Sequence, residues 1–179
     1  GTQQSRRLEG QRFTLFSNGK VLVVTVGWQQ GIGATRNSDL VGFDLAKEGE
    51  LRFGPVEVED ARWTFYGAPV CDADRCWVGF QLRDVSAQDH VACFDMRSGK
   101  QLWRTRVFSA DSVGHDVVEE FANYLLTMHE GAIYFNSHLR YVATLKGDNG
   151  KIRRLTKYPR QGPKRKNPVG EPWHALRDL

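Results

Sequence analysis

Short runs of apolar and β-branched residues, separated by turn-forming residues, follow one another along most of this chain. The run from Val21 to Val26 is rich in valine and too short for a helix, so it predicts a buried strand. A run ending at Met96 precedes Arg97-Ser98-Gly99, and a second run continues to Trp103, which predicts two strands joined by a tight turn. These segments lack the three- and four-residue apolar spacing of an amphipathic helix. The pattern therefore predicts an all-β protein.

One strand–turn–strand pattern occurs three times at an almost constant spacing. Asp95 lies 51 residues after Asp44 and 51 residues before Lys146. The first copy contains one additional residue, Glu48, before its glycine. Repeats of this length that are built from strands are typical of the blades of β-propellers. The residues that define the blade motif are Phe43, Asp44, Gly49 and Phe53 in the first copy, Ala92, Phe94, Asp95, Gly99 and Trp103 in the second, and Ala143, Leu145 and Gly150 in the third.

Each copy belongs to a unit that we expect to form four short antiparallel strands. The shared glycine allows the chain to reverse between the third and fourth strands, because glycine tolerates positive φ angles. An aromatic residue four positions later, Phe53 or Trp103, can cover the gap between two blades, whereas Arg154 takes this place in the third unit. Within the second unit, the polar residues 84–89 are expected to form a loop. The expected organisation is a lead-in over 1–11, blades over 12–60, 61–110 and 111–160, and a linker over 161–179.

The charge is distributed unevenly along the chain. Residues 1–90 contain ten Lys and Arg against twelve Asp and Glu, whereas residues 91–179 contain fifteen against nine. The segment 151–166 alone holds eight basic residues and no acidic one. A solvated blade edge and loop is the favoured interpretation, and polyanion binding by this segment is an alternative. No apolar run of roughly eighteen residues is present, so no transmembrane segment is expected in this sequence.

Few residues combine into a pattern that indicates chemistry. Asp72 and Asp74 could ligate a hard cation, but aspartate is common in turns for its backbone hydrogen bonds, which is the favoured interpretation. The densest polar group in a loop consists of His115, Asp116, Glu119 and Glu120, a candidate loop site for a ligand or metal, although a solvated connection is favoured. We assign no catalytic, cofactor-binding or metal-ligating residue from the sequence.

The second copy of the motif resembles the repeat of a known family. Its pattern Ala92-x-x-Asp95-x-x-Ser98-Gly99-x-x-x-Trp103 is similar to the repeat of the pyrroloquinoline-quinone-like (PQQ-like) β-propellers. The third unit, from Leu125 to Arg160, resembles large bacterial envelope proteins that carry such propellers and have no established activity. The resemblance extends from about Phe13 to Arg160, and it implies a partial propeller of three blades out of about seven or eight, belonging to a longer chain.

Two kinds of function are implied by this resemblance. The first is a noncatalytic binding or scaffold propeller of the bacterial cell envelope or periplasm, which would contact protein partners or the remaining blades of its own chain, and would hold no cofactor in this segment. The second is a quinone-dependent oxidoreductase that binds PQQ and calcium through residues outside this sequence. The adjacent cysteine pair of such dehydrogenases is not found in this sequence. We favour the first, and nucleic acid is not an expected partner. Membrane anchoring would use a part of the protein outside this sequence.

The three cysteines raise a question of redox state. Cys71 and Cys76 flank a turn of four residues, so they should face each other across a hairpin, at a separation that needs little adjustment for a disulfide. The envelope location implied by the resemblance would permit oxidation. Three reduced core cysteines are an equally acceptable interpretation, and Cys93 is expected to be a buried free thiol in either case.

Overall fold

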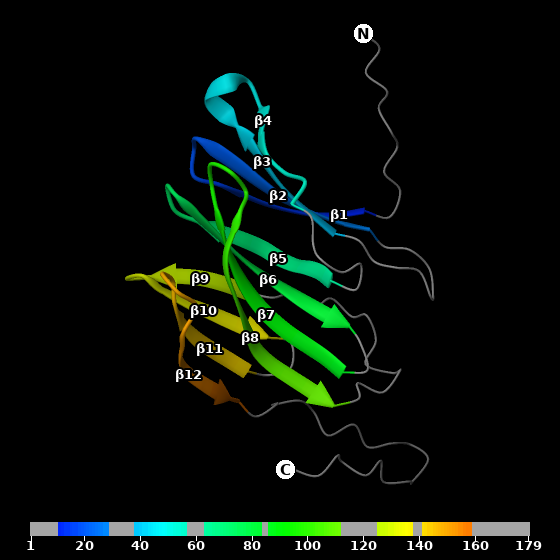
Figure 1. Cartoon of the computed structure of the whole chain (residues 1–179), viewed down its shortest axis with the longest axis vertical. Helices are drawn as coiled ribbons and strands as arrows, with labels where there is room; N and C mark the ends of the chain where they lie inside the picture. The colour runs from blue at the N-terminus through cyan, green and yellow to red at the C-terminus, as the bar shows by residue number, and fades with distance from the viewer. Residues whose placement is uncertain are drawn as a thin grey trace, which may run out of the picture.

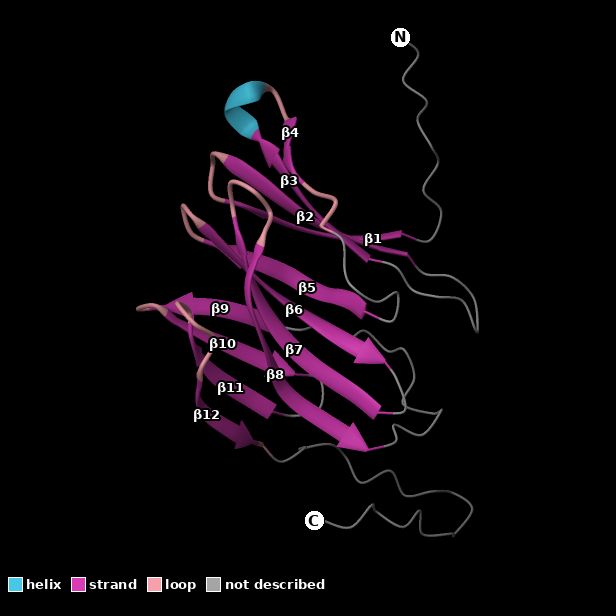
Figure 2. Cartoon of the chain, in the orientation of Figure 1, coloured by secondary structure: helices cyan, strands magenta, loops and turns pink. Residues whose placement is uncertain are grey.

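The computed structural model consists of strands packed as three small sheets (Figures 1 and 2). Twelve strands and one short 3-10 helix lie within the described part of the chain. No described helix is long and apolar enough to cross a membrane. The structure describes residues 11–28, 38–56, 63–83, 86–111, 125–137 and 141–158.

Each sheet contains four antiparallel strands that pair in the order in which they occur along the chain. Blade 1 comprises β1 (Gln11–Ser17), β2 (Val21–Trp28), β3 (Ser38–Asp44) and β4 (Glu50–Phe53), with the 3-10 helix η1 (Leu45–Lys47) between β3 and β4. Blade 2 comprises β5 (Trp63–Cys71), β6 (Arg75–Arg83), β7 (Ser86–Asp95) and β8 (Gln101–Asp111). Blade 3 comprises β9 (Leu125–His129), β10 (Ala132–Ser137), β11 (Tyr141–Lys146) and β12 (Ile152–Lys157).

The repeated glycine closes the same turn in each blade. Gly49, Gly99 and Gly150 all have positive φ angles, of 83°, 70° and 71°. Each donates its N–H to the carbonyl of the residue that ends the third strand, at 2.9, 2.8 and 2.8 Å respectively. A side chain at such φ angles would be strained, which explains why the pattern requires glycine at the entry to the fourth strand.

The three blades are stacked in series, with blade 2 between blades 1 and 3 (Figure 1). Strands β1 and β2 lie against β5, while β5 and β6 lie against β9. One apolar cluster fills the contact between blades 1 and 2, and a second fills the contact between blades 2 and 3. Both faces of blade 2 are therefore buried, which is why its strands read as almost continuous apolar runs. The predicted fold class, an all-β partial propeller with three four-stranded blades, is confirmed.

Some predicted boundaries differ from the structure. Asp111 ends β8 of blade 2 instead of beginning blade 3, and Gln11 begins β1 instead of ending a lead-in. The predicted loop over residues 84–89 is wrong from Ser86 onward, because β7 begins there. The polar side chains of this stretch suggested that it is exposed to solvent. Neighbouring blades cover the strand on both faces, however, and Asp89 is fully buried.

Candidate functional site at the blade interfaces

An aromatic side chain from the fourth strand of blade 1, and another from that of blade 2, lies on the turn glycine of the next blade. A Cβ atom on Gly99 would lie 2.8 Å from Cδ2 of Phe53, and one on Gly150 would lie 2.5 Å from Cε3 of Trp103. Real Cβ atoms do not approach carbon atoms so closely, so only glycine fits beneath these rings. Both glycines are buried. The motif glycine therefore has two roles: it forms the turn of its own blade, and it receives the aromatic residue of the preceding blade.

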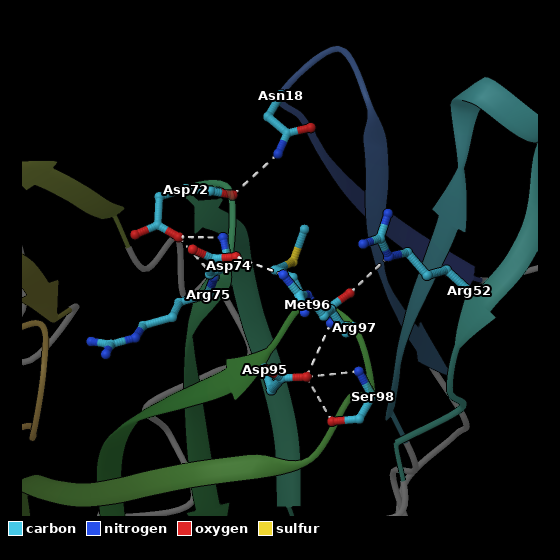
Figure 3. Close-up of polar contacts among 9 residues, drawn as sticks. All are labelled: Asn18, Arg52, Asp72, Asp74, Arg75, Asp95, Met96, Arg97 and Ser98. Atoms are coloured by element: carbon cyan, nitrogen blue, oxygen red, sulfur yellow. Dashed lines mark hydrogen bonds and ion pairs between the residues drawn. The ribbon is translucent and has the colours of Figure 1, made fainter.

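Turn contacts join the blades along the same rim (Figure 3). The Arg52 Nε donates to the Met96 carbonyl at 3.0 Å, and the Asn18 Nδ2 donates to the Asp72 carbonyl at 3.1 Å. The Met96 N–H in turn donates to the Asp74 carbonyl at 2.8 Å, within blade 2. Since Asn18 and Arg52 belong to blade 1, both residues attach its turns to those of blade 2.

The motif aspartate supports its own turn. The Asp95 Oδ1 accepts hydrogen bonds from the Ser98 hydroxyl at 2.7 Å and from the N–H groups of Ser98 and Arg97 at 2.8 and 3.1 Å (Figure 3). These hydrogen bonds, that from the Ser98 hydroxyl foremost, hold the pKa of Asp95 below its ordinary value because they favour the carboxylate. Asp44 accepts the Ala46 N–H at 3.1 Å in the same way.

The contact between blades 2 and 3 contains polar groups that the sequence analysis did not identify. Asp89 is fully buried, and it accepts hydrogen bonds from the Gln81 Nε2 at 3.0 Å and from the Ser137 hydroxyl. In addition, the indole N–H groups of Trp77 and Trp103 both donate to the Gly147 carbonyl, at 3.0 and 3.3 Å. A buried carboxylate requires such partners, because burial without hydrogen bonds would cost several kcal/mol.

His90 lies on the other side of β7, within the contact between blades 1 and 2. Its ring stacks on Phe80, with centroids 5.3 Å apart, and meets the edge of Trp63 at 4.8 Å. Its Nδ1 has no hydrogen-bond partner among the described residues. Burial, followed by the charges of Arg104 and Arg106, lowers the pKa of His90 to about 4. The imidazole is therefore neutral near pH 7.

A cavity of about 340 Å³ lies beside the contact between blades 1 and 2. Its apolar lining includes Phe65, Phe80 and Phe94, and its charged lining consists of Lys100 and Arg104. Val56 also lines the cavity, and it is followed by residues outside the described part of the chain. The cavity belongs to the contact between blades 1 and 2, and we assign no ligand to it.

The other candidate residues of the sequence analysis do not combine into a site in the described residues. Asp72 accepts the N–H groups of Asp74 and Arg75 at 2.8 and 2.7 Å, and Asp74 pairs with Arg97 at 3.9 Å. These contacts give both aspartates a role in the hairpin. Within the described ranges, no group of three or more His, Cys, Asp or Glu side chains could hold a metal ion. The candidate loop residues His115, Asp116, Glu119 and Glu120 lie outside the described residues.

The cysteines are free thiols in the structure, as in the second of the two interpretations drawn from the sequence. Cys71 and Cys76 are directly opposite each other in the hairpin, as predicted, but no bond joins them. Burial and a hydrogen bond with Cys71 raise the pKa of Cys76 well above its ordinary value, so the reactive thiolate is disfavoured. Cys93 is a buried free thiol as expected, and burial raises its pKa to about 12.

The two outer faces of the series differ from the inner ones. On blade 1, the face turned away from blade 2 carries two apolar rows across the strands, in which Leu15 and Leu51 are 60% and 58% exposed. No described atom lies within 4 Å of the position that a Cβ would take on Gly49. Arg154, at the third aromatic position, is exposed. We call the face of blade 1 that is turned away from blade 2 the open face of blade 1. Its side chains are Leu15, Leu22, Val24, Val41, Phe43 and Leu51, of which Val24 is buried and Leu22, Val41 and Phe43 are partly buried.

Comparison with known proteins gives similarity at the level of the fold. No family model matches the chain, and no curated protein matches it. Among solved structures, the chain is similar to BamB from Moraxella catarrhalis (16% identity, TM-score 0.49, 82% of this chain and 37% of that one). It is also similar to two quinohemoprotein alcohol dehydrogenases, each with a TM-score of 0.49 over 75% of this chain. ADHIIG from Pseudomonas putida HK5 is 16% identical and is covered over 25% of its length. The enzyme from Comamonas testosteroni is 14% identical and is covered over 26% of its length. The chain thus spans between a quarter and two fifths of the length of these three structures.

Proposed function

We propose that this chain is part of a noncatalytic binding or scaffold propeller that works through protein–protein contacts. The open face of blade 1 is the observation that carries this proposal. It is a pair of apolar rows on a four-stranded sheet, with two leucines more than half exposed. Contiguous apolar surface of this kind marks sites of protein contact, because its burial releases ordered water.

The repeat itself supports the same function. The corresponding faces of the other two blades are covered by a preceding blade, and Phe94 and Leu145 on them are only 3% and 0% exposed. Phe43, which corresponds to them in the repeat, is partly exposed. The face of blade 1 therefore has the composition of a surface that another sheet covers. The sequence resemblance favours the bacterial cell envelope or periplasm as the location of this contact.

Site-specific photo-crosslinking tests the proposal. A benzophenone amino acid replaces Leu51 on the open face in cells that produce the protein at its natural level. The control carries it in place of Leu102, a leucine that is 48% exposed and belongs to blade 2, whose two faces are covered. We expect a defined protein adduct, recovered with the envelope fraction, from position 51 and none from position 102. If position 51 gives no adduct, or the protein is recovered with the cytosol, the proposed contact or its location is wrong.

A further inference from the structure

The sequence contains two Asn-Gly pairs, Asn18-Gly19 between β1 and β2 and Asn149-Gly150 between β11 and β12. An asparagine that precedes glycine can deamidate without an enzyme, because the glycine nitrogen is unhindered enough to attack the side-chain carbonyl carbon. Both residues of the first pair are exposed, whereas Gly150 is buried beneath the Trp103 ring. The same reactive pair therefore occurs in two different environments within one chain.

The nitrogen that attacks in this reaction is accessible at the first pair. The Gly19 N–H donates to the exposed Ser17 hydroxyl at 3.1 Å, and no described atom lies within 4 Å of the position that a Cβ would take on Gly19. The Gly150 N–H instead donates to the Lys146 carbonyl at 2.8 Å, beneath the ring. A solvent base can therefore take the Gly19 proton, while attack by the Gly150 nitrogen requires that a buried backbone hydrogen bond be broken first.

The side chain of Asn18 is held in a way that favours the attack. Its Oδ1 accepts the N–H groups of Lys20 and Val21 at 3.0 and 2.9 Å, so the carboxamide is folded back over its own turn. Two N–H donors on this oxygen stabilise the negative charge that develops there when the carbonyl carbon is attacked. The Oδ1 of Asn149 accepts the Lys151 N–H at 3.0 Å.

The amide nitrogen that the reaction removes joins two blades (Figure 3). The Asn18 Nδ2 donates to the Asp72 carbonyl at 3.1 Å. A carboxylate in its place has no hydrogen to donate, and its oxygen would face the carbonyl oxygen of Asp72. An attractive contact between the turns of blades 1 and 2 thus becomes a repulsive one, while the bond from the Arg52 Nε to the Met96 carbonyl remains.

We propose that the Asn18-Gly19 turn is a self-deamidating site whose product loosens the contact between the turns of blades 1 and 2. The Gly19 nitrogen gives its proton to a solvent base and bonds to the side-chain carbonyl carbon of Asn18, and the side-chain nitrogen leaves with a proton from water as ammonia. Water then adds to either carbonyl of the cyclic imide and breaks its bond to nitrogen, which leaves aspartate or isoaspartate at position 18. The net reaction consumes one water and releases one ammonia. This inference is independent of the proposed protein-binding function.

Peptide mass spectrometry of the purified protein, aged at mildly alkaline pH in water enriched in heavy oxygen, tests the site. A deamidated residue takes up heavy oxygen, and fragmentation distinguishes aspartate from isoaspartate. In the folded protein we expect Asn18 to be lost about tenfold or more faster than Asn149, because only at Gly150 must a buried hydrogen bond break before the attack. In urea the two rates should be alike, since both residues then precede a glycine in an unfolded chain. Equal rates in the folded protein, or an Asn18 that persists there while both residues are lost in urea, would overturn the proposal.

Two variants test the consequence for the contact between the blades. Asn18→Asp keeps the oxygen that accepts within the turn and removes the donor to the Asp72 carbonyl, whereas the control Asn149→Asp leaves this donor in place. Hydrogen exchange in the turn over 72–75 should be about threefold or more faster in Asn18→Asp, because the turn loses one hydrogen bond, and unchanged in Asn149→Asp. Unchanged exchange in Asn18→Asp, or an equal change in both variants, would overturn the proposed loosening.

Discussion

The two contacts of blade 2 use the same motif positions with different chemistry. The contact with blade 1 is closed by Phe53, which carries no polar atom, over a cluster of aromatic rings that includes Phe65, Phe80 and Phe94. The contact with blade 3 is closed by Trp103, whose indole N–H reaches the Gly147 carbonyl. The second contact also encloses the carboxylate of Asp89 with its hydrogen bonds. Both contacts therefore share a large ring over a glycine, whereas the hydrogen bonds around it differ: those of the first contact join turns at the rim, and those of the second include the ring itself and a buried carboxylate.

Removal of the docking ring should have the largest effect. Trp103→Ala is expected to cost roughly 3–5 kcal/mol of unfolding free energy, because it removes the ring over Gly150 and a hydrogen bond together. Arg154→Ala, at the same motif position on an uncovered face, is expected to cost less than about 0.5 kcal/mol at concentrations where the chain is monomeric. Urea unfolding followed by circular dichroism measures both. Equal costs would show that the motif positions do not correspond.

Substitution of the acceptor glycines separates docking from turn formation. Gly150→Ala should cost about 2–4 kcal/mol, because it combines backbone strain with clashes against the Trp103 ring and the Thr105 hydroxyl. Gly49→Ala has the same kind of positive φ but open space above it, so only the strain of about 1–2 kcal/mol is expected. The same unfolding assay compares the two. A cost at Gly49 equal to that at Gly150 would mean that turn strain alone explains the glycine.

Acid should weaken the contact between blades 1 and 2 through His90. Its pKa in the folded chain, about 4, lies below the value of about 6.5 in an unfolded chain, so unfolding takes up a proton between these values. Stability is therefore full above about pH 6.5 and falls as the pH drops toward 4, by the order of 1–2 kcal/mol. His90→Phe should flatten the pH dependence of the unfolding midpoint in this window. An unchanged slope would show that other groups cause it.

The cysteines are expected to contribute least to stability, because no disulfide joins Cys71 to Cys76. Titration of denatured chain with a thiol reagent, without reductant, should count three free thiols. Slow modification of the folded chain is expected as well, because all three side chains are buried. A count of one would restore the bridge across the hairpin.

The sequence predicted the architecture well because the motif recurs at a constant spacing along most of the chain. The spacing of Asp44, Asp95 and Lys146 identified the blades, although it could not show which surface each ring meets. Phe53 and Trp103 each lie on the turn glycine of the next blade. This contact depends on how neighbouring sheets are placed, and no local sequence pattern specifies that placement. Asp89 and His90 were missed for a related reason: polar residues predict exposure, and only the covering blades make this part of β7 buried.

For the polar residues of the turns, local chemistry was a sufficient guide. The sequence favoured a turn role for Asp72 over a cation site, and its hydrogen bonds to the N–H groups of Asp74 and Arg75 confirm that role.

A double-mutant cycle between Trp103 and Gly150 tests the docking arrangement most directly. If the indole lies on this glycine, removal of the ring relieves its part of the clash and leaves the part with the Thr105 hydroxyl, so Gly150→Ala should cost less in the Trp103→Ala background than in the original chain. The predicted coupling free energy is about 1–3 kcal/mol. Additive costs, with a coupling close to zero, would contradict the conclusion that each blade is joined to the next by a ring over a glycine.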